Sequence, residues 1–365
     1  MRITKSVRRL EAYTPGEQPK AKNVVKLNTN ENPYPPSPAC ARVLKSFDLD
    51  RLRRYPDPNF GDLRAALAKL NGTRPENVFV GNGSDEILAL AAKTFVENDE
   101  QIGSLDPSYS LYKTLAAIRD VKWQGVEPRR RCRTEDKDSF LDLHLPPTPI
   151  SLFLWTNPNA PTGTFAAPKE IAAFARRFRG VVLVDEAYAD FARTNCMKLA
   201  TTRGNRNILV MRTFSKSYSL AGLRVGYCVG PKDLVEALYK VKDSYNVDAL
   251  AQAVALAAVR DQAWMKANVA KVVKTRTWFT QELVRRDWDV LPSESNFVFA
   301  RPPTAGEGKR KKGKGKSADE IFSLLRKRNI FVRYFPAPKT RDRIRITIGT
   351  DAQMKKLLKA LDELN

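Results

Sequence analysis

The chain of 365 residues is poor in the residues on which several common chemistries depend. It has a single histidine, His144, and four cysteines that lie far apart and form no Cys-x-x-Cys pair. A zinc site, a disulfide framework and a nucleophile activated by histidine are therefore not indicated, and we expect no metal site. The cysteines are expected to be ordinary reduced thiols; they are Cys40, Cys132, Cys196 and Cys228.

Long apolar runs are also missing. The longest helix-like apolar stretch covers residues 249–259 and is followed by Arg260 and Asp261, so it is too short to span a bilayer. The first ten residues contain Arg and Lys but no apolar stretch of the kind that signal peptides have. We therefore predict a cytoplasmic protein without a membrane partner, in which residues 249–259 form a buried, Ala-rich helix.

Acidic residues are outnumbered by basic ones, 40 to 63, which gives a formal net charge of +23. Two dense clusters, Arg129–Arg133 and Lys309–Lys316, hold part of the excess. Such a charge suits anionic partners, so a basic nucleic-acid-binding protein is the alternative from another functional class. Because no interleaved aromatic platform or zinc finger accompanies the clusters, we favour solvated surface and a basic loop, and consider nucleic acid an unlikely partner.

Short apolar runs alternate with helical patterns through the first two thirds of the chain. This alternation predicts an α/β fold with a mostly parallel sheet, in which unusual residues gather at the carboxyl ends of the strands. The expected strands are 78–81, 151–155, 181–184, 208–211 and 225–229, and the expected helices include 64–70, 87–95 and 169–178.

The last third has a different character, with long charged helices and three further strands, at 296–300, 330–334 and 343–348. Because a chain of this length exceeds the usual size of one core, we predict two lobes. The expected division is an N-terminal arm at 1–45, a large domain at 46–265 and a smaller α+β domain at 266–365, with a basic loop at 304–317.

Lys216 and Asp185 carry the strongest chemical signal. Lys216 lies between two serines and precedes a Gly-Leu-Arg-Val-Gly turn at 222–226, which is typical of a Schiff-base lysine beside an anion site. Asp185 follows the apolar strand 181–184, where a buried carboxylate needs a cation such as a protonated pyridine nitrogen. A helix N-cap is the simpler interpretation of Asp185 taken alone.

Three loops add possible ligand contacts. The turn at 157–163 provides Asn157, whose amide could face a phenolate oxygen together with Tyr188. Residues 81–85 would expose backbone N–H groups at a helix start, while Glu86 in place of a third glycine disfavours a dinucleotide fold. The phosphate-matching side chains near Lys216 are Thr213, Ser215 and Arg224.

These motifs together resemble the fold-type-I, pyridoxal-phosphate-dependent aminotransferases and, within that family, the histidinol-phosphate aminotransferases. The similarity extends from about Tyr13 to near the C-terminus. The motifs that carry it are residues 30–34 (Asn-Glu-Asn-Pro-Tyr), 54–57 (Arg-Tyr-Pro-Asp), 83–86 (Gly-Ser-Asp-Glu), 157–163 (Asn-Pro-Asn-Ala-Pro-Thr-Gly), 185–188 (Asp-Glu-Ala-Tyr) and 215–216 (Ser-Lys).

The resemblance implies pyridoxal 5'-phosphate as the cofactor and assigns a role to each matching residue. Lys216 would hold the cofactor and shuttle a proton, and Asp185 would pair with the pyridinium nitrogen. Asn157 and Tyr188 would hold the ring oxygen, and Tyr109 would stack on the ring. The phosphate would be held by Ser84, Asp85, Thr213, Ser215 and Arg224, joined by Tyr55 from the other subunit of a homodimer.

The same resemblance implies the substrate contacts. Arg345 matches the carboxylate-binding arginine of the family, and Arg333 and Tyr13 match positions that meet a substrate phosphate. The expected reaction is transamination of histidinol phosphate with 2-oxoglutarate, giving imidazole acetol phosphate and glutamate in histidine biosynthesis. Related alternatives are a threonine-phosphate decarboxylase and an aromatic amino acid aminotransferase, and the two basic clusters are not features of the family.

Overall fold

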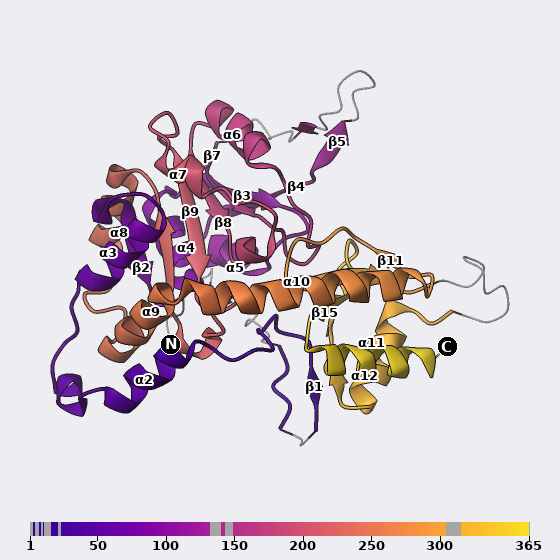
Figure 1. Ribbon diagram of the computed structural model, residues 1–365. Coiled ribbons are helices and arrows are strands. Elements are labelled where there is room, and N and C mark those ends of the chain that lie inside the picture. The colour runs from indigo at the N-terminus through magenta and orange to yellow at the C-terminus, as the bar shows by residue number, and fades with distance from the viewer. Residues whose placement is uncertain are drawn as a thin grey trace.

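The computed structural model describes residues 3, 7–8, 10, 16–20, 23–131, 140–142, 149–303 and 315–364, with the side chains of 129–131 and 140–142 left out. The chain forms two main sheets with their helices, and the long helix α10 (Gln262–Val284) runs past both (Figure 1). Parts of both predicted basic clusters, at 132–133 and 309–314, lie outside the described residues, as does His144.

The larger sheet has seven strands in the order β2-β10-β9-β8-β7-β3-β4. The five strands from β9 to β4 run parallel, while β10 pairs antiparallel with both β9 and β2. The strands are β2 (Val78–Gly81), β3 (Gln101–Leu105), β4 (Lys122–Val126), β7 (Ile150–Thr156), β8 (Val181–Asp185), β9 (Ile208–Thr213) and β10 (Gly226–Val229).

Both faces of this sheet are covered by helices, because its strands are apolar on both sides. Phe153 and Trp155 of β7 belong to one core, and Leu152 and Leu154 belong to the other. The first face packs against α2 (Pro38–Ser46), α3 (Gly61–Leu70), α6 (Pro168–Arg177), α7 (Met197–Thr201) and α9 (Ala249–Arg260). The second packs against α4 (Ser84–Thr94), α5 (Leu111–Ile118) and α8 (Lys232–Val241). The predicted α/β fold with a mostly parallel central sheet is confirmed.

The smaller sheet is antiparallel, in the order β11-β12-β15-β14. Its strands are β11 (Asp289–Val290), β12 (Phe297–Arg301), β14 (Arg333–Tyr334) and β15 (Ile344–Thr347), and its core includes residues of α10, α11 (Ala318–Lys327) and α12 (Asp351–Asp362). β1 (Val25–Lys26) pairs with β13 (Ile330–Phe331) in a separate parallel ladder.

The single strand expected at 330–334 is wrong, because the chain changes partner at Val332. Phe331 accepts a hydrogen bond from Leu27 of the N-terminal segment, whereas Arg333 pairs with Arg345 of β15. The sequence reasoning also missed β3 and β4, whose residues are less continuously apolar than those of β7 to β9. The remaining short elements are η1 (Leu49–Arg53), η2 (Pro75–Asn77), η3 (Ala189–Phe191), η4 (Ala221–Leu223), β5 (Arg129–Arg131) and β6 (Phe140–Asp142).

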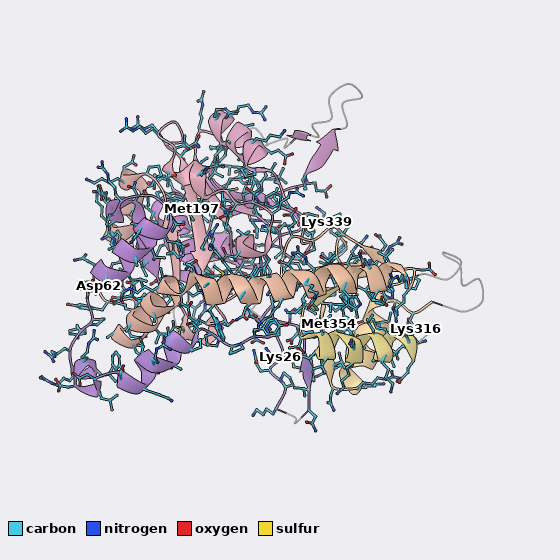
Figure 2. All side chains as sticks on the ribbon, in the orientation of Figure 1. Lys26, Asp62, Met197, Lys316, Lys339 and Met354 are labelled. Carbon is cyan, nitrogen blue, oxygen red and sulfur yellow. The ribbon has the colours of Figure 1, made fainter. Side chains whose placement is uncertain are left out.

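The helix α10 connects the two cores. Met265 near its start packs beside the large sheet, and Val272 and Phe279 pack in the core of the small sheet. Figure 2 shows Met197 and Met354, one from each core, on opposite sides of this helix. The expected boundary at residue 265 therefore falls inside a helix, and the division of the chain into domains stays a prediction. Every helix in the described part of the chain is too short or too polar to cross a membrane.

Candidate active site

The carboxyl ends of the parallel strands bring the predicted chemistry to one edge of the large sheet. Asp185 ends β8 and lies opposite Thr156 of β7 and Met211 of β9 in the strand register. Lys216 follows the end of β9 within three residues. Because ligands of such sheets bind at this edge, a cavity is expected here.

A cavity of about 630 Å³ opens at this edge and extends to the small sheet. Its wall includes residues from the N-terminal segment, the strand ends of the large sheet and β14 and β15 of the small sheet. Eleven of the predicted site residues line it: Ser84, Asp85, Tyr109, Asp185, Tyr188, Thr213, Ser215, Lys216, Arg224, Arg333 and Arg345.

Lys216 places its amine in this cavity. The Nζ atom donates a hydrogen bond to the carbonyl oxygen of Thr29 at 3.2 Å and lies 5.8 Å from the centre of the Tyr188 ring. Burial, and then the positive charge of Arg345, lower the pKa of the Lys216 amine to about 8. A neutral amine near physiological pH can act as a nucleophile or a base, which an ordinary surface lysine cannot.

This lowered pKa leads to a first prediction. At pH 8 about half of the Lys216 amine is neutral, against under about 1% for an ordinary lysine. In the cofactor-free protein, an acylating reagent should therefore modify Lys216 about tenfold or more faster than the average exposed lysine. The rate, followed by peptide mass spectrometry as the pH is varied, should have its midpoint near pH 8. A midpoint above pH 10 would contradict the environment described above.

Asp185 is a buried carboxylate at the end of β8, with 4% of its surface exposed. It accepts hydrogen bonds from the Tyr112 hydroxyl at 2.7 Å and from the backbone N–H of Ala187 at 3.0 Å. Burial raises the pKa of the Asp185 carboxyl to about 6. Among the described residues, no lysine or arginine forms an ion pair with it, so it can receive a cationic group of a ligand.

Backbone and side-chain donors form an anion seat beside Lys216. Gly83, at φ +83°, precedes α4, and a Cβ atom there would come within 2.7 Å of Arg224 Nη2. Arg224 Nη1 donates to the Ser215 hydroxyl at 3.4 Å, and the Thr213 hydroxyl donates to the same oxygen at 2.9 Å. The start of a helix, two hydroxyls and a guanidinium together suit a phosphate group.

Arg333 and Arg345 lie directly opposite each other on β14 and β15. Both guanidinium groups lie over the ring of Phe335, at 5.5 Å and 5.3 Å from its centre. Like charges directly opposite on neighbouring strands are destabilising, and an anion held between them offsets this cost. The structure thus places the two arginines, which we expected at two separate anion sites, side by side on one wall.

The N-terminal segment provides contacts that the sequence reasoning did not assign. Asn30 Nδ2 donates to the Tyr188 hydroxyl at 2.9 Å, so the Tyr188 proton can still be donated into the cavity. Asn32 Nδ2 bonds the carbonyl oxygens of Lys216 and Ser217, both at 3.2 Å. The motif at 30–34 could have indicated these contacts, because polar amide side chains are seldom buried unless they form hydrogen bonds.

Two predicted residues in the described part of the chain, Asn157 and Tyr55, do not line the cavity. The side-chain amide of Asn157 bonds the backbone of Ala166: Nδ2 donates to the carbonyl oxygen at 3.0 Å, and Oδ1 accepts from the N–H at 2.8 Å. Tyr55 is 80% exposed and stacks on Tyr245 with ring centres 4.3 Å apart. Tyr13 lies outside the described residues. Their roles at the site stay predictions.

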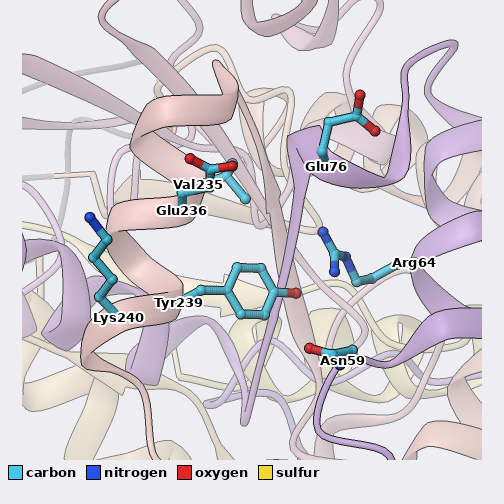
Figure 3. Close-up of a pocket in the computed structure, with 7 residues that line it drawn as sticks. All are labelled: Asn59, Arg64, Glu76, Val235, Glu236, Tyr239 and Lys240. Atoms are coloured by element: carbon cyan, nitrogen blue, oxygen red, sulfur yellow. The ribbon is translucent and has the colours of Figure 1, made fainter.

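A second hollow, of about 380 Å³, is lined by residues of α3 and α8, with Asn59 and Glu76. Figure 3 shows its lining residues. Its charged residues balance, with Arg64 and Lys240 against Glu76 and Glu236. Arg64 also donates two hydrogen bonds to the carbonyl oxygen of Pro75, at 3.2 Å and 2.8 Å. No predicted site residue lines this hollow, so the larger cavity is the candidate active site.

Comparison with known proteins agrees with this geometry. The model of the aminotransferase class I and II family matches residues 22–361. The chain is 42% identical over 366 residues to a histidinol-phosphate aminotransferase of Syntrophotalea carbinolica, covering 99% of each chain. It is also 42% identical over 363 residues to histidinol-phosphate aminotransferase 1 of Bradyrhizobium diazoefficiens, covering 98% of this chain and 97% of the relative.

Solved structures show the same fold. The histidinol-phosphate aminotransferase from Sinorhizobium meliloti, in complex with pyridoxal-5'-phosphate, has a TM-score of 0.83 at 24% identity, covering 99% of this chain and 97% of the other. The L-threonine-O-3-phosphate decarboxylase from Porphyromonas gingivalis has a TM-score of 0.77 at 23% identity, covering 93% and 99%. Likeness at these identities concerns the fold alone. The family match over most of the chain is decisive, and the chain belongs to the class I and II aminotransferases.

Proposed function

We propose that this protein is a pyridoxal-phosphate-dependent transaminase that converts histidinol phosphate and 2-oxoglutarate to imidazole acetol phosphate and glutamate, in histidine biosynthesis. The names of relatives that are 42% identical over nearly the whole chain support this substrate. The observation that carries the proposal is one cavity that holds a lysine amine with a pKa of about 8, a buried carboxylate and an anion seat.

The residues present fit pyridoxal phosphate. Asp185 would pair with the protonated ring nitrogen, since a buried carboxylate is stabilised by a cation. The anion seat around Arg224 and Ser215 would take the phosphate. Gly83 has a φ of +83°, which other residues rarely adopt, and a Cβ atom there would displace the Arg224 guanidinium from the seat. Lys216 would hold the aldehyde carbon. When bound, the cofactor supplies an electron sink that makes the substrate Cα–H bond acidic.

The remaining chemistry depends on groups of the chain. The Lys216 amine, half neutral at pH 8, can take the proton from the substrate carbon and later return one. While it stays ionised, Asp185 would keep the ring nitrogen of the cofactor protonated. The Tyr188 hydroxyl, which accepts from Asn30, would donate its proton to the ring oxygen of the cofactor. These three groups hold or move protons at defined positions.

The arginine pair accounts for two substrates in one pocket. Histidinol phosphate has no carboxylate, and its phosphate ester is attached to the carbon next to the amine-bearing carbon. Glutamate carries a carboxylate at that place. Arg333 and Arg345, side by side over Phe335, can bind either anion, and the larger phosphate can reach both guanidinium groups.

This arrangement yields a prediction for Arg333→Ala. The KM for histidinol phosphate should rise about 10- to 100-fold, as expected for the loss of a charged hydrogen bond, while the KM for glutamate should change less than about threefold. Steady-state kinetics with each substrate measure the difference. Arg343→Ala is the matched control, because Arg343 precedes β15 and pairs with Asp289 outside the cavity. Equal losses with both substrates would contradict a role in phosphate binding.

The test of the proposed function is an assay of cofactor-loaded protein with histidinol phosphate, phenylalanine and threonine phosphate. Fast keto-product formation from histidinol phosphate, dependent on 2-oxoglutarate, is the expected result. Release of CO2 from threonine phosphate without keto-acid formation would instead identify a decarboxylase. Preference for phenylalanine would identify an aromatic aminotransferase.

We also propose a cytoplasmic homodimer with shared active sites. Tyr55 does not line the cavity of its own chain, and the neighbouring Leu49 and Leu52 are 74% and 56% exposed. Exposed apolar side chains gathered on one segment are typical of an interface. A second copy of the chain that covers η1 would bury them and would bring Tyr55 to the phosphate seat of its partner.

A further inference from the structure

A buried charge network lies behind the cavity wall and has no part in the chemistry proposed above. Arg212 of β9 donates to Glu186 from Nε at 3.1 Å and from Nη2 at 2.9 Å, and to Asp190 from Nη1 at 2.9 Å. The Arg212 side chain is 13% exposed, and that of Glu186 is fully buried. None of these three side chains lines the cavity.

The network reaches the lysine through Ser217. The Ser217 hydroxyl donates to the second oxygen of Asp190 at 2.5 Å, and Ser217 directly follows Lys216. Ser217 is buried, as are its neighbours Phe214 and Tyr218. Asp190 therefore joins Arg212 with one oxygen and the lysine loop with the other.

The same network also holds the loop of Asp185. Glu186 follows Asp185 directly, and its other carboxylate oxygen accepts the backbone N–H of Cys196. Arg212 thus pairs with the acids at both ends of the loop 186–190, Glu186 and Asp190, and Tyr188 lies at the centre of this loop. A buried guanidinium with both acids satisfied forms a rigid connection, since breaking it would leave an unpaired buried charge.

We propose that Asp190 is a positioning residue, which couples the loop of Asp185 and Tyr188 to the loop of Lys216 through Ser217. Its consequence for catalysis rests on the proposed function, but the coupling itself does not. Rigid support behind reactive side chains is what holds them in productive geometry. Loss of the Asp190 link should let the lysine loop loosen and its amine reach water.

The position of the Lys216 amine can be followed through its titration, because none of the groups that surround it would be altered. The charged groups that act on the amine are Arg345, Glu31, Asp85 and Arg224, with Asp185 close by. These lie on β15, the N-terminal segment, α4, the turn after η4 and β8. Ser217→Ala alters no charge, so a change in the pKa of Lys216 in that variant would report movement of the amine. Asp190→Ala removes a negative charge, which by itself would lower the pKa of Lys216, so an upward shift in that variant would likewise report movement.

The experiment uses the full chain without cofactor and measures the acylation rate of Lys216 by peptide mass spectrometry from pH 6 to 11. We expect Asp190→Ala and Ser217→Ala each to lower the rate at pH 8 at least fivefold and to move the midpoint upward. The double variant should lose no more than the worse single variant, because both remove the same link. Asp362→Ala, which breaks an ion pair with Arg286 far along the chain, is the matched control and should leave the rate unchanged.

Unchanged rate and midpoint in a folded Ser217→Ala variant would overturn the proposal, as would losses that multiply in the double variant. Ser217→Ala keeps the Arg212 pairs intact, so it remains informative where Asp190→Ala fails to fold. The measurement needs no cofactor. A protein that fails to bind pyridoxal phosphate would refute the proposed function, whereas the acylation result would still decide the coupling.

Discussion

Lys216→Ala is expected to lower the transamination rate about 10⁴-fold and to remove the absorption band of protein-bound pyridoxal phosphate. In the proposed function one amine both holds the cofactor and moves the substrate proton, and a positioned acid–base group contributes about 10²- to 10⁴-fold. Absorption spectra of the loaded protein and turnover with histidinol phosphate measure the two effects. The free energy of unfolding of the cofactor-free variant should not fall, because removing a buried amine relieves its desolvation.

Lys242→Ala is the control for this variant. Burial also lowers the pKa of Lys242, but this lysine lies over Phe60 and outside the cavity. The control should keep the band and the rate. A Lys216→Ala protein that retains the band and more than about a tenth of the rate would refute the assignment of the lysine, and the mechanism with it.

Asp185→Asn is expected to have opposite effects on activity and stability. The rate should fall about 100-fold or more, because an amide cannot keep the ring nitrogen protonated. The cofactor-free variant should nevertheless be more stable than the wild type at pH 8, by about 1 to 3 kcal/mol. The gain arises because a buried carboxylate without a cation is costly to ionise, whereas asparagine needs no ionisation.

The stability gained by Asp185→Asn should depend on pH, because the pKa of the carboxyl differs between the folded and the unfolded state. The pKa of the Asp185 carboxyl is about 6 in the folded protein and near 3.8 in the unfolded chain. Well below pH 3.8 the carboxyl is protonated in both the folded and the unfolded state, so its ionisation does not lower the free energy of unfolding. Between pH 4 and 6 the unfolded chain ionises first, and the folded protein loses stability as the pH rises. The advantage of Asp185→Asn should therefore be absent near pH 4 and complete above pH 6.

Urea unfolding of the cofactor-free protein at pH 4, 6 and 8 measures this effect. Asp57→Asn is the contrasting control, because hydrogen bonds from the backbone of Gly61 and Asn59 lower the pKa of the Asp57 carboxyl. That substitution should destabilise the protein at neutral pH. If Asp185→Asn were also destabilising at pH 8, the carboxylate would already have a cationic partner in the folded chain.

The chemical centre could be predicted from local sequence because its residues belong to short motifs at strand ends. Lys216 after β9 and Asp185 at the end of β8 both followed apolar runs that the sequence marks clearly. β3 and β4 were missed because polar residues interrupt them, and their parallel pairing with distant strands compensates for weak local preference.

The second half of the cavity could not be predicted in this way. Arg333 and Arg345 lie opposite each other because of the register between β14 and β15. The sequence of the connection at 335–343 does not determine this register. The bonds of Asn30 to Tyr188 and of Asn32 to Lys216 join residues more than 150 positions apart. The change of partner at Val332 likewise depends on where the N-terminal segment lies.

The sequence by itself determined the fold class and the family resemblance, and it marked Lys216 and Asp185 as the candidate reactive pair, because hydrophobic patterning and short motifs act over a few residues. Only the tertiary structure decided which side chains share the cavity and how the arginines face one another. It also decided that Arg212 and Asp190 connect the loop after Asp185 to the loop of Lys216. Contacts between distant segments depend on packing and strand register, and no local pattern encodes either.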